Sequence, residues 1–195
     1  MASSIVGLKD LVYAPLLDDS ASGATYGEVK PLAPAITAST ETAEETATQY
    51  ADNGPIEVVS QIGETTITIT ASALEQAVLA EILGQEVRKG VIVYKQTATA
   101  PYIAIGFKGT KANGKNRNVW LLKGRFATPS DEWNTKADSP EFSNQEITAT
   151  FIRRDFDEAF KITGDEEVTE FDQYKGTFFD QVFDPAQLDV APTTP

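Results

Sequence analysis

The stretch GVIVYKQTATAPYIAIGFKGTKANGKNRNVWLLKGRF, residues 90–126, decides the fold. It contains three runs rich in branched and aromatic side chains, GVIVYK, PYIAIGFKG and RNVWLLKGRF, and such side chains favour β-strands. The segment KANGKN joins the last two runs, and an Asn-Gly pair between two strands favours a type I′ hairpin turn. The stretch therefore predicts an antiparallel meander whose last turn lies at Asn113 and Gly114.

Further strands are predicted on both sides of this stretch. In residues 146–155 (EITATFIRRD) apolar and polar side chains alternate, as they do along a half-buried strand. Residues 156–164 (FDEAFKITG) are expected to pair with that strand. Three upstream runs also have the composition of strands: residues 11–17 (LVYAPLL), residues 29–37 (VKPLAPAIT) and residues 56–71 (IEVVSQIGETTITITA), the last with a break at Gly63.

Residues 72–83 carry the clearest helical pattern. Ser72 and Glu75 have the spacing of a capping box, in which two side chains satisfy backbone groups at the start of a helix. Gly84 stands just past the pattern, where a glycine in the left-handed conformation ends many helices. Four apolar residues fall on one stripe at helical spacing: Leu74, Ala77, Val78 and Ile82.

A single domain of residues 1–184 is expected, because 195 residues correspond to about one domain. Its fold class is mainly β, an antiparallel β-sandwich or partly open barrel with one packed α-helix. Residues 38–55 (ASTETAEETATQYADNGP) are acidic and threonine-rich and show no clean period, so we predict a long extended loop. Such long loops are usually functional or disordered. Residues 185–195 are predicted to form a flexible tail.

The composition argues against an enzyme. The chain has no cysteine and no histidine, which excludes disulfides, thiolate nucleophiles, and the commonest general base and metal ligand. Its glycines and lysines lack the spacing of a phosphate-binding loop, and its acidic clusters lack the spacing of an EF-hand. We therefore expect no catalytic residue, no metal and no cofactor. Trp120 is expected in the core, and Trp133 is expected to be available for a subunit contact.

The charge balance argues against tight binding of DNA. There are 29 acidic and 16 basic residues, so the formal net charge is −13, and contact with phosphates needs cationic density. The chain has no run near the roughly 18 apolar residues of a membrane span. The first residues lack the pattern of a signal peptide. We expect synthesis in a cytoplasm and no membrane partner.

Charge is distributed in three blocks along the chain. Residues 31–87 contain nine acidic residues and no basic residue. Residues 88–154 contain twelve basic and five acidic residues, and residues 155–195 contain eleven acidic and two basic residues. One interpretation is a drift of local composition on a solvated surface. The other is that acidic and basic surfaces meet between copies of the chain, because complementary patches determine register in assemblies.

On the residues alone, two classes of function stay open. One is a structural protein that assembles with itself, and the other is a β-sandwich binding module, for example for carbohydrate. Six segments, in their order, add a family resemblance: GLKDLVYAPL, ATYGEVKPLA, QYADNGPIEVV, ALEQAVLAEILG, the stretch of residues 90–126, and PEFSNQEITATFIRRD. Together they cover most of residues 5–155. They resemble the major tail proteins, or tail tube proteins, of phages of Gram-positive bacteria with long, non-contractile tails.

The resemblance implies a structural protein of the virion, made and assembled in the cytoplasm of the host bacterium. Family members form rings, typically hexameric, in which inner strands of neighbouring subunits join into a barrel. The rings stack around a tape measure protein, and the tube meets distal tail and tail terminator proteins at its ends. Phage DNA passes through the lumen without specific binding. The alternative is a β-sandwich binding or decoration module on a virion or cell surface.

The resemblance turns three sets of residues into candidate sites. The segment 38–55 is expected to reach the adjacent ring, to become ordered on stacking, and to dock on a basic surface. Its candidate residues are Glu41, Glu44, Glu45, Tyr50 and Asp52. The basic candidates, in an inter-subunit patch, are Lys108, Lys111, Lys115 and Arg117. The candidates for lining the lumen are short polar or acidic residues on one face of two strands: Glu64, Thr66, Thr68, Thr70, Glu146, Thr148 and Thr150. The alternative for this last set is an outer, solvent-facing surface.

Overall fold

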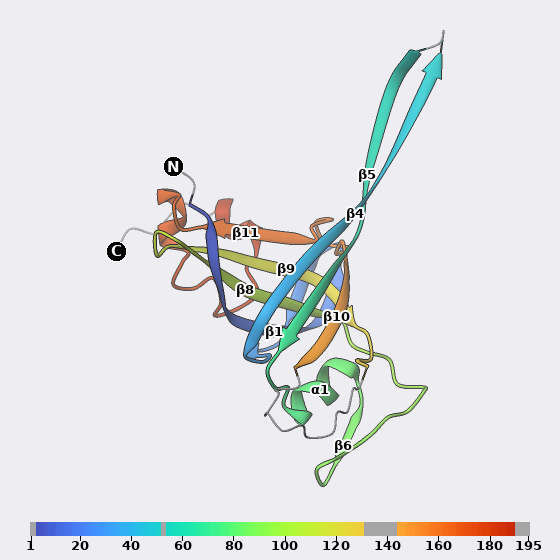
Figure 1. Ribbon diagram of the computed structural model, residues 1–195, viewed down its shortest axis with the longest axis vertical. Coiled ribbons are helices and arrows are strands. Elements are labelled where there is room, and N and C mark those ends of the chain that lie inside the picture. The colour runs from blue at the N-terminus through green and yellow to red at the C-terminus, as the bar shows by residue number, and fades with distance from the viewer. Residues whose placement is uncertain (1–2, 52–53, 131–143, 190–195) are drawn as a thin grey trace, which may run out of the picture.

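A computed structural model describes residues 3–51, 54–130 and 144–189 of the chain. Its centre is one antiparallel sheet of nine strands in the order β2-β1-β8-β9-β10-β5-β4, with β3 paired to β1 and β11 paired to β9 (Figure 1). The sheet does not close on itself. The predicted fold class is confirmed. The strands are β1 (Ile5–Ser20), β2 (Gly23–Tyr26), β3 (Lys30–Pro31), β4 (Ala35–Ala51), β5 (Gly54–Ala71), β8 (Ile103–Lys111), β9 (Asn116–Phe126), β10 (Gln145–Ile152) and β11 (Lys161–Asp165).

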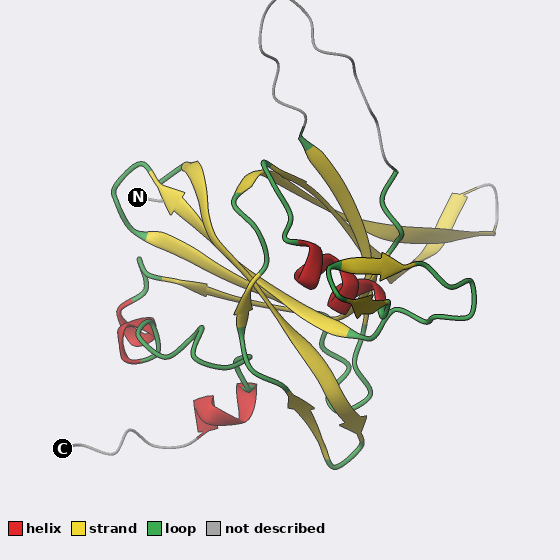
Figure 2. Ribbon diagram, turned by 90° about the horizontal axis from the view of Figure 1, so that it is seen from below, coloured by secondary structure: helices red, strands yellow, loops and turns green. Residues whose placement is uncertain are grey.

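A few smaller elements complete the fold. Helix α1 (Gln76–Leu83) follows β5, and a separate two-stranded sheet of β6 (Glu86–Arg88) and β7 (Val91–Val93) comes next. Two short 3-10 helices, η1 (Thr169–Gln173) and η2 (Pro185–Asp189), lie near the C-terminus (Figure 2). The segment predicted as a flexible tail therefore begins as a 3-10 helix, and its last six residues lie outside the described residues.

The core has two parts, one on each side of the central strands. Helix α1 packs Ile82 and Leu83 onto the first part, together with Ile67 and Ile69 of β5. The second part is covered by the segment around η1 and η2, and Trp120 donates a hydrogen bond of 2.9 Å to the Phe178 carbonyl there. Trp120 is fully buried, as predicted. The buried residues of the second part are Ala14, Ala104, Trp120, Leu122, Phe178, Val182 and Phe183.

Helix α1 begins later than its predicted capping box. The N-cap residue is Glu75, without a side-chain capping hydrogen bond, so the pair of Ser72 and Glu75 does not form the box. The Ser72 hydroxyl instead faces the Pro34 carbonyl at 3.5 Å, because the chain here is still turning out of β5. The end of the helix is as predicted, since Gly84 has a φ of 64°. Ala77 of the predicted apolar stripe is exposed, and Ala80 is buried instead.

The β8–β9 hairpin is confirmed, but its turn differs from the predicted type. Among the turn residues only Gly114 has a positive φ, 82°, and its N–H donates to the Lys111 carbonyl at 2.9 Å. This is a type I turn followed by a left-handed glycine, an arrangement typical of three-residue hairpin loops. The type I′ pattern of two positive φ values occurs instead at Lys89 (49°) and Gly90 (81°), between β6 and β7.

Two predicted pairings also differ. The run at the start of the quoted stretch, β7, pairs with β6 in the small sheet and is not a strand of the meander. Strand β11 pairs with the first half of β9, from Arg117 to Leu121, while β10 pairs with the second half, from Lys123 to Phe126. Both strands meet the same side of β9, so β11 cannot reach β10. Trp133 lies outside the described residues.

The two left-handed glycines differ in their surroundings, which gives a matched test. A Cβ on Gly84 would collide with the Thr99 carbonyl oxygen, whereas a Cβ on Gly114 would meet nothing within 4 Å. We expect Gly114→Ala to lower the free energy of unfolding by about 1 kcal/mol, through the positive φ alone. Gly84→Ala should cost about 3 kcal/mol, because a backbone clash is added. Urea unfolding of the two variants measures this, and equal losses would contradict the packing of α1 described here.

Candidate functional site

Strands β4 and β5 form a hairpin that leaves the body of the molecule (Figure 1). Strand β10 flanks β5 as far as the pair of Phe151 and Thr65. Beyond Thr42 and Thr65, whose hydroxyl oxygens lie 2.9 Å apart, β5 pairs with β4 alone among the described residues. A strand rises about 3.3 Å per residue, so residues 43–51 reach roughly 30 Å from the sheet. Residues 43–51 and 54–64 are called the arm below.

The structure differs from the prediction of a loop over residues 38–55. The segment is β4 and the start of β5, and it is already paired in the single chain. Each strand supplies the hydrogen-bonding partners of the other, and threonine favours extended backbone. A strand shows a period of two only when one face is buried. Both faces of the arm are exposed, which explains why no period is visible in the sequence.

The arm carries apolar side chains that have no core to enter. Ile56, Val58 and Ile62 alternate along one face of β5, and Val59 lies on the other face. These side chains and Tyr50 are between 56% and 70% exposed. An isolated two-stranded hairpin is marginally stable in water, and grouped exposed apolar residues mark contact surfaces. The arm thus has the features of a surface that is completed by a partner.

The acidic candidates of this segment are placed on the arm and at its base. Glu41 faces Thr66 just below the arm, while Glu44 and Glu45 face Ile62 and Gln61 within it. All three carboxylates are exposed, and none makes an ion pair within the described part of the chain. Asp52 lies outside the described residues. The arm is therefore both apolar and negatively charged.

The seven candidates for the lumen come from neighbouring strands and largely share one face. Three pairs sit directly opposite each other across β10 and β5, and β4 extends each pair by one more polar residue. The face consists of three rows, Thr37-Thr70-Glu146, Ser39-Thr68-Thr148 and Glu41-Thr66-Thr150. Glu64 follows Thr66 by one period along β5, at the base of the arm. These rows are called the polar face below.

The polar face is the reverse side of a core strand. Ile67 and Ile69 alternate with its threonines and are fully buried, so the period of two separates core from polar face. The threonines of β5 and β10 are half-buried, whereas Thr37 and the glutamates are exposed. Arg125 of β9 continues the row Glu41-Thr66-Thr150 beside Thr150, and its Cζ atom lies 3.8 Å from the ring centroid of Tyr102. The juxtaposition of β5 and β10 could not be seen in the sequence, because Ala71 and Gln145 are 74 positions apart.

The basic candidates are mostly engaged within the chain. Lys111 is buried, 2% exposed, and its ammonium group lies 2.6 Å from Asp165 and 2.8 Å from Glu167. Lys108 pairs with Asp10 at 2.8 Å, and Arg117 pairs with Asp165 at 3.2 Å. A buried lysine cannot belong to an exposed patch, so the prediction fails for Lys111. Lys115 is exposed at the hairpin turn and makes no ion pair within the described residues.

Other basic residues of the central block are also matched by acids of the same chain. Lys123 pairs with Asp19 at 2.7 Å, and both side chains are nearly buried. The Arg154 guanidinium donates one hydrogen bond to each carboxylate oxygen of Asp157. These hydrogen bonds hold the pKa of Asp157 below its ordinary value of 3.8. Several basic residues of the central block thus pair inside the molecule with acids of the C-terminal block, namely Lys111, Arg117, Lys123, Arg153 and Arg154.

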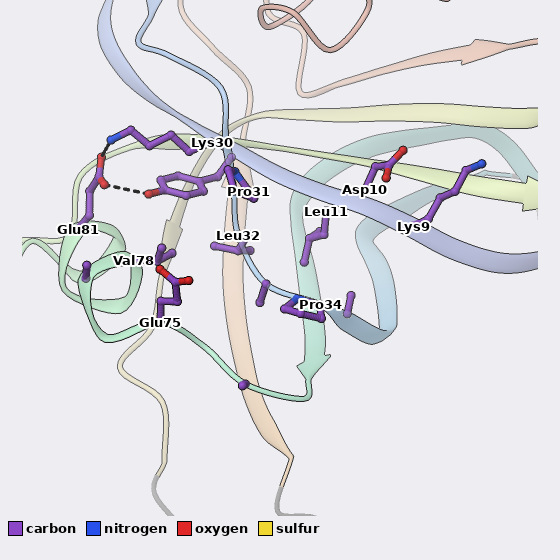
Figure 3. Close-up of a pocket in the computed structure, with 15 residues that line it drawn as sticks. Lys9, Asp10, Leu11, Lys30, Pro31, Leu32, Pro34, Glu75, Val78 and Glu81 are labelled. Carbon is purple, nitrogen blue, oxygen red and sulfur yellow. Dashed lines mark hydrogen bonds and ion pairs between the residues drawn. The ribbon is translucent and has the colours of Figure 1, made fainter.

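A groove lies between α1, β1 and β3 (Figure 3). At its wall the Glu81 carboxylate accepts hydrogen bonds from the Tyr13 hydroxyl at 2.8 Å and from the Lys30 ammonium at 2.7 Å. Burial, with help from Glu81, raises the pKa of Tyr13. Burial would raise the pKa of Glu81, but the hydrogen bonds from Lys30 and Tyr13 outweigh it and lower that pKa. The three groups hold α1 against the sheet.

No cluster of three or more acidic side chains that could hold a metal ion occurs in residues 3–51, 54–130 and 144–189. Over the same residues, no helix has the length and apolar character needed to cross a membrane.

Comparison with known proteins gives few matches. No protein-family model matches the chain, and no curated protein matches it. Among solved structures, a chain from the cryo-EM structure of the anti-feeding prophage cap, the cap that terminates the tube, is similar in shape. The two chains share 12% identity over 80% of this chain and 88% of that chain, with a TM-score of 0.46.

The ion pairs of Lys111 can be tested by comparing a substitution of Lys111 with the same substitution of Lys115. Lys111→Met leaves Asp165 and Glu167 facing each other without their shared cation, so the urea midpoint of unfolding should fall markedly. Lys115→Met, at an exposed position of the same turn, should leave the midpoint unchanged, because exposed charges contribute little to stability. Equal midpoints for the two variants would contradict the ion cluster.

Proposed function

We propose that this chain is a structural subunit of a phage tail tube, which assembles with copies of itself into stacked rings. The arm carries the proposal, because a roughly 30 Å hairpin with exposed apolar side chains is not explained by the stability of a single chain. The resemblance of residues 5–155 to the major tail proteins of long, non-contractile tails supplies the identity of the assembly.

The sheet offers a second feature that favours assembly. Strand β4 ends the strand order, so its outer edge has no strand partner among the described residues. An edge of 17 residues without lysine or proline is open to pairing with another strand. In the proposed ring, edges of neighbouring subunits join the inner sheets into a continuous barrel, which removes the free edges by closure.

The polar face is the proposed wall of the lumen. Its threonines and serine are short, which keeps a channel wide, and its carboxylates repel phosphates. The proposed wall thus lets DNA slide without binding it. Within this account the ring is a hexamer, the tube surrounds a tape measure protein, and its ends meet distal tail and tail terminator proteins. The subunit has no catalytic task in the virion.

Excision of the arm tests its role in assembly. Residues 43–64 are replaced by Asn-Gly, which can close a hairpin between the paired residues Thr42 and Thr65. We expect a folded monomer whose core unfolds as in the parent, and no rings or tubes by negative-stain microscopy at concentrations at which the parent forms them. Val59→Thr, which keeps the arm and changes one exposed side chain, should still form tubes.

Tubes of normal appearance from the excised variant would contradict the role of the arm. A parent chain that stays monomeric at every concentration would favour the alternative, a binding or decoration module on a virion or cell surface.

Labelling of single cysteines tests the position of the polar face. Because the chain has no cysteine, Thr68→Cys introduces a single thiol on this face. In assembled tubes it should react with a small maleimide but not with a maleimide attached to a large polymer, which is excluded from a lumen. In monomers it should react with both. Thr177→Cys, at an exposed position outside the sheet, should react with both reagents in both states, and equal behaviour of the two variants in tubes would place the polar face outside.

A further inference from the structure

The β6–β7 hairpin lies at the opposite end of the molecule from the arm. In Figure 1 the longest axis is vertical, and the arm stands at the top while β6 stands at the bottom. This hairpin pairs with no strand of the main sheet among the described residues. Its turn residue Lys89 has a φ of 49°, a conformation that lysine rarely adopts. Lys89 thus places a cation at the turn of this small hairpin.

The hairpin exposes two valines on a face that no described residue covers. Its register places Val93 beside Glu86 and Val91 beside Arg88, and these four residues share one face. Val91 is 59% exposed and Val93 is 42% exposed. Tyr94, directly after β7, is 55% exposed. A three-residue strand pair with this much exposed apolar surface has the same character as the arm: it lacks a covering element.

Its charge is opposite to that of the arm. Arg88, Lys89 and Lys95 surround the valines, and the nearby acid Glu86 pairs with Arg88 at 2.7 Å and with Lys95 at 3.2 Å. Two net positive charges thus remain on the hairpin. The arm carries Glu44, Glu45, Glu57 and Glu64 and no basic residue.

The other basic candidates offer a poorer counterpart. Lys108, Lys111 and Arg117 are already paired with acids of the same chain. Lys115 is exposed, but no exposed large apolar side chain of its hairpin, residues 103–126, accompanies it. The exposed cations Arg88, Lys89 and Lys95 belong to a hairpin that also exposes Val91 and Val93.

We propose that the β6–β7 hairpin of one copy is the docking site for the arm of a second copy, an inference that rests on the proposed assembly function. The arm face with Ile56, Val58 and Ile62 covers Val91 and Val93, and the Glu44 carboxylate, which lies opposite Ile62 on that face, is placed beside Arg88 and Lys89. Because the two surfaces differ and lie at opposite ends, the contact repeats head to tail and generates an open-ended stack. It also lets chains of like net charge attach to one another.

Charge reversal on both sides tests this contact. The variant Arg88→Glu/Lys89→Asp and the variant Glu44→Lys/Glu45→Lys should each fail to form tubes, since like charges then face each other. An equimolar mixture of the two should form tubes again, because each arm then meets a hairpin of opposite charge. Lys115→Glu serves as the control and should assemble as the parent does. Pelleting and negative-stain microscopy report the result, and urea unfolding confirms that each variant is folded.

Cysteine pairing tests the contacting face. One preparation carries Val58→Cys, another carries Val91→Cys, and the mixture is oxidised after assembly. A disulfide-linked dimer of one chain of each kind is expected. The matched control replaces Val58→Cys by Val59→Cys, which has similar exposure, 57% against 60%, on the opposite face of the arm. It should give at least tenfold less dimer, because a disulfide needs Cα atoms within about 7 Å.

The outcomes separate this inference from the proposed function. If the arm-excised chain fails to assemble but Arg88→Glu/Lys89→Asp assembles normally, the docking site is wrong and the tube function stands. Equal dimer from Val58→Cys and Val59→Cys, or none from either, also overturns the docking site. Normal tubes from the arm-excised chain overturn the proposed role of the arm, and the docking site with it.

Discussion

Beyond Thr42 and Thr65, the described strands β4 and β5 have no hydrogen-bonding partner except each other, and the rest of the structure is organised around that constraint. The body beneath them is a complete fold, with core packed on both sides of the central strands. The arm adds apolar surface in water and no buried contact of its own. Contact with a partner stabilises such an apolar surface, because it removes the surface from water. We therefore interpret the single chain as one subunit of an assembly. The free edge of β4 leads to the same conclusion from the backbone.

The charged residues fall into two groups, those that form ion pairs within the chain and those proposed to form the contact between copies. Residues of the central basic block and of the C-terminal acidic block pair inside the chain, as at Lys111 with Asp165 and at Arg154 with Asp157. These pairs fix the C-terminal segment to the sheet. The acidic residues of the arm are left without such partners among the described residues, and the exposed cations of the β6–β7 hairpin stand at the far end. The blocks seen in the sequence thus divide into intramolecular pairs and a pair of complementary ends.

The sequence predicted the elements well and their neighbours poorly. The β8–β9 hairpin, the end of α1 at Gly84 and the buried Trp120 followed from local pattern, because each depends on residues close together in the chain. Residues 38–55 were predicted as a loop because a hairpin whose two faces are both exposed to solvent has no hydrophobic period, whereas residues 56–71, with the alternating Ile56, Val58 and Ile62, were predicted as a strand. The engagement of Lys111 depends on residues more than fifty positions away, which composition cannot show. The same holds for the polar face: each strand was predicted singly, but their direct pairing is a matter of topology.

The central claim is that the arm is completed by a second copy of the chain. A cryo-EM map of the assembled protein measures this most directly. The account predicts arm density lying along a neighbouring subunit, with the Val58 side chain buried in the contact and the polar face turned toward the lumen. A map in which the arms extend into solvent without touching another copy would contradict it.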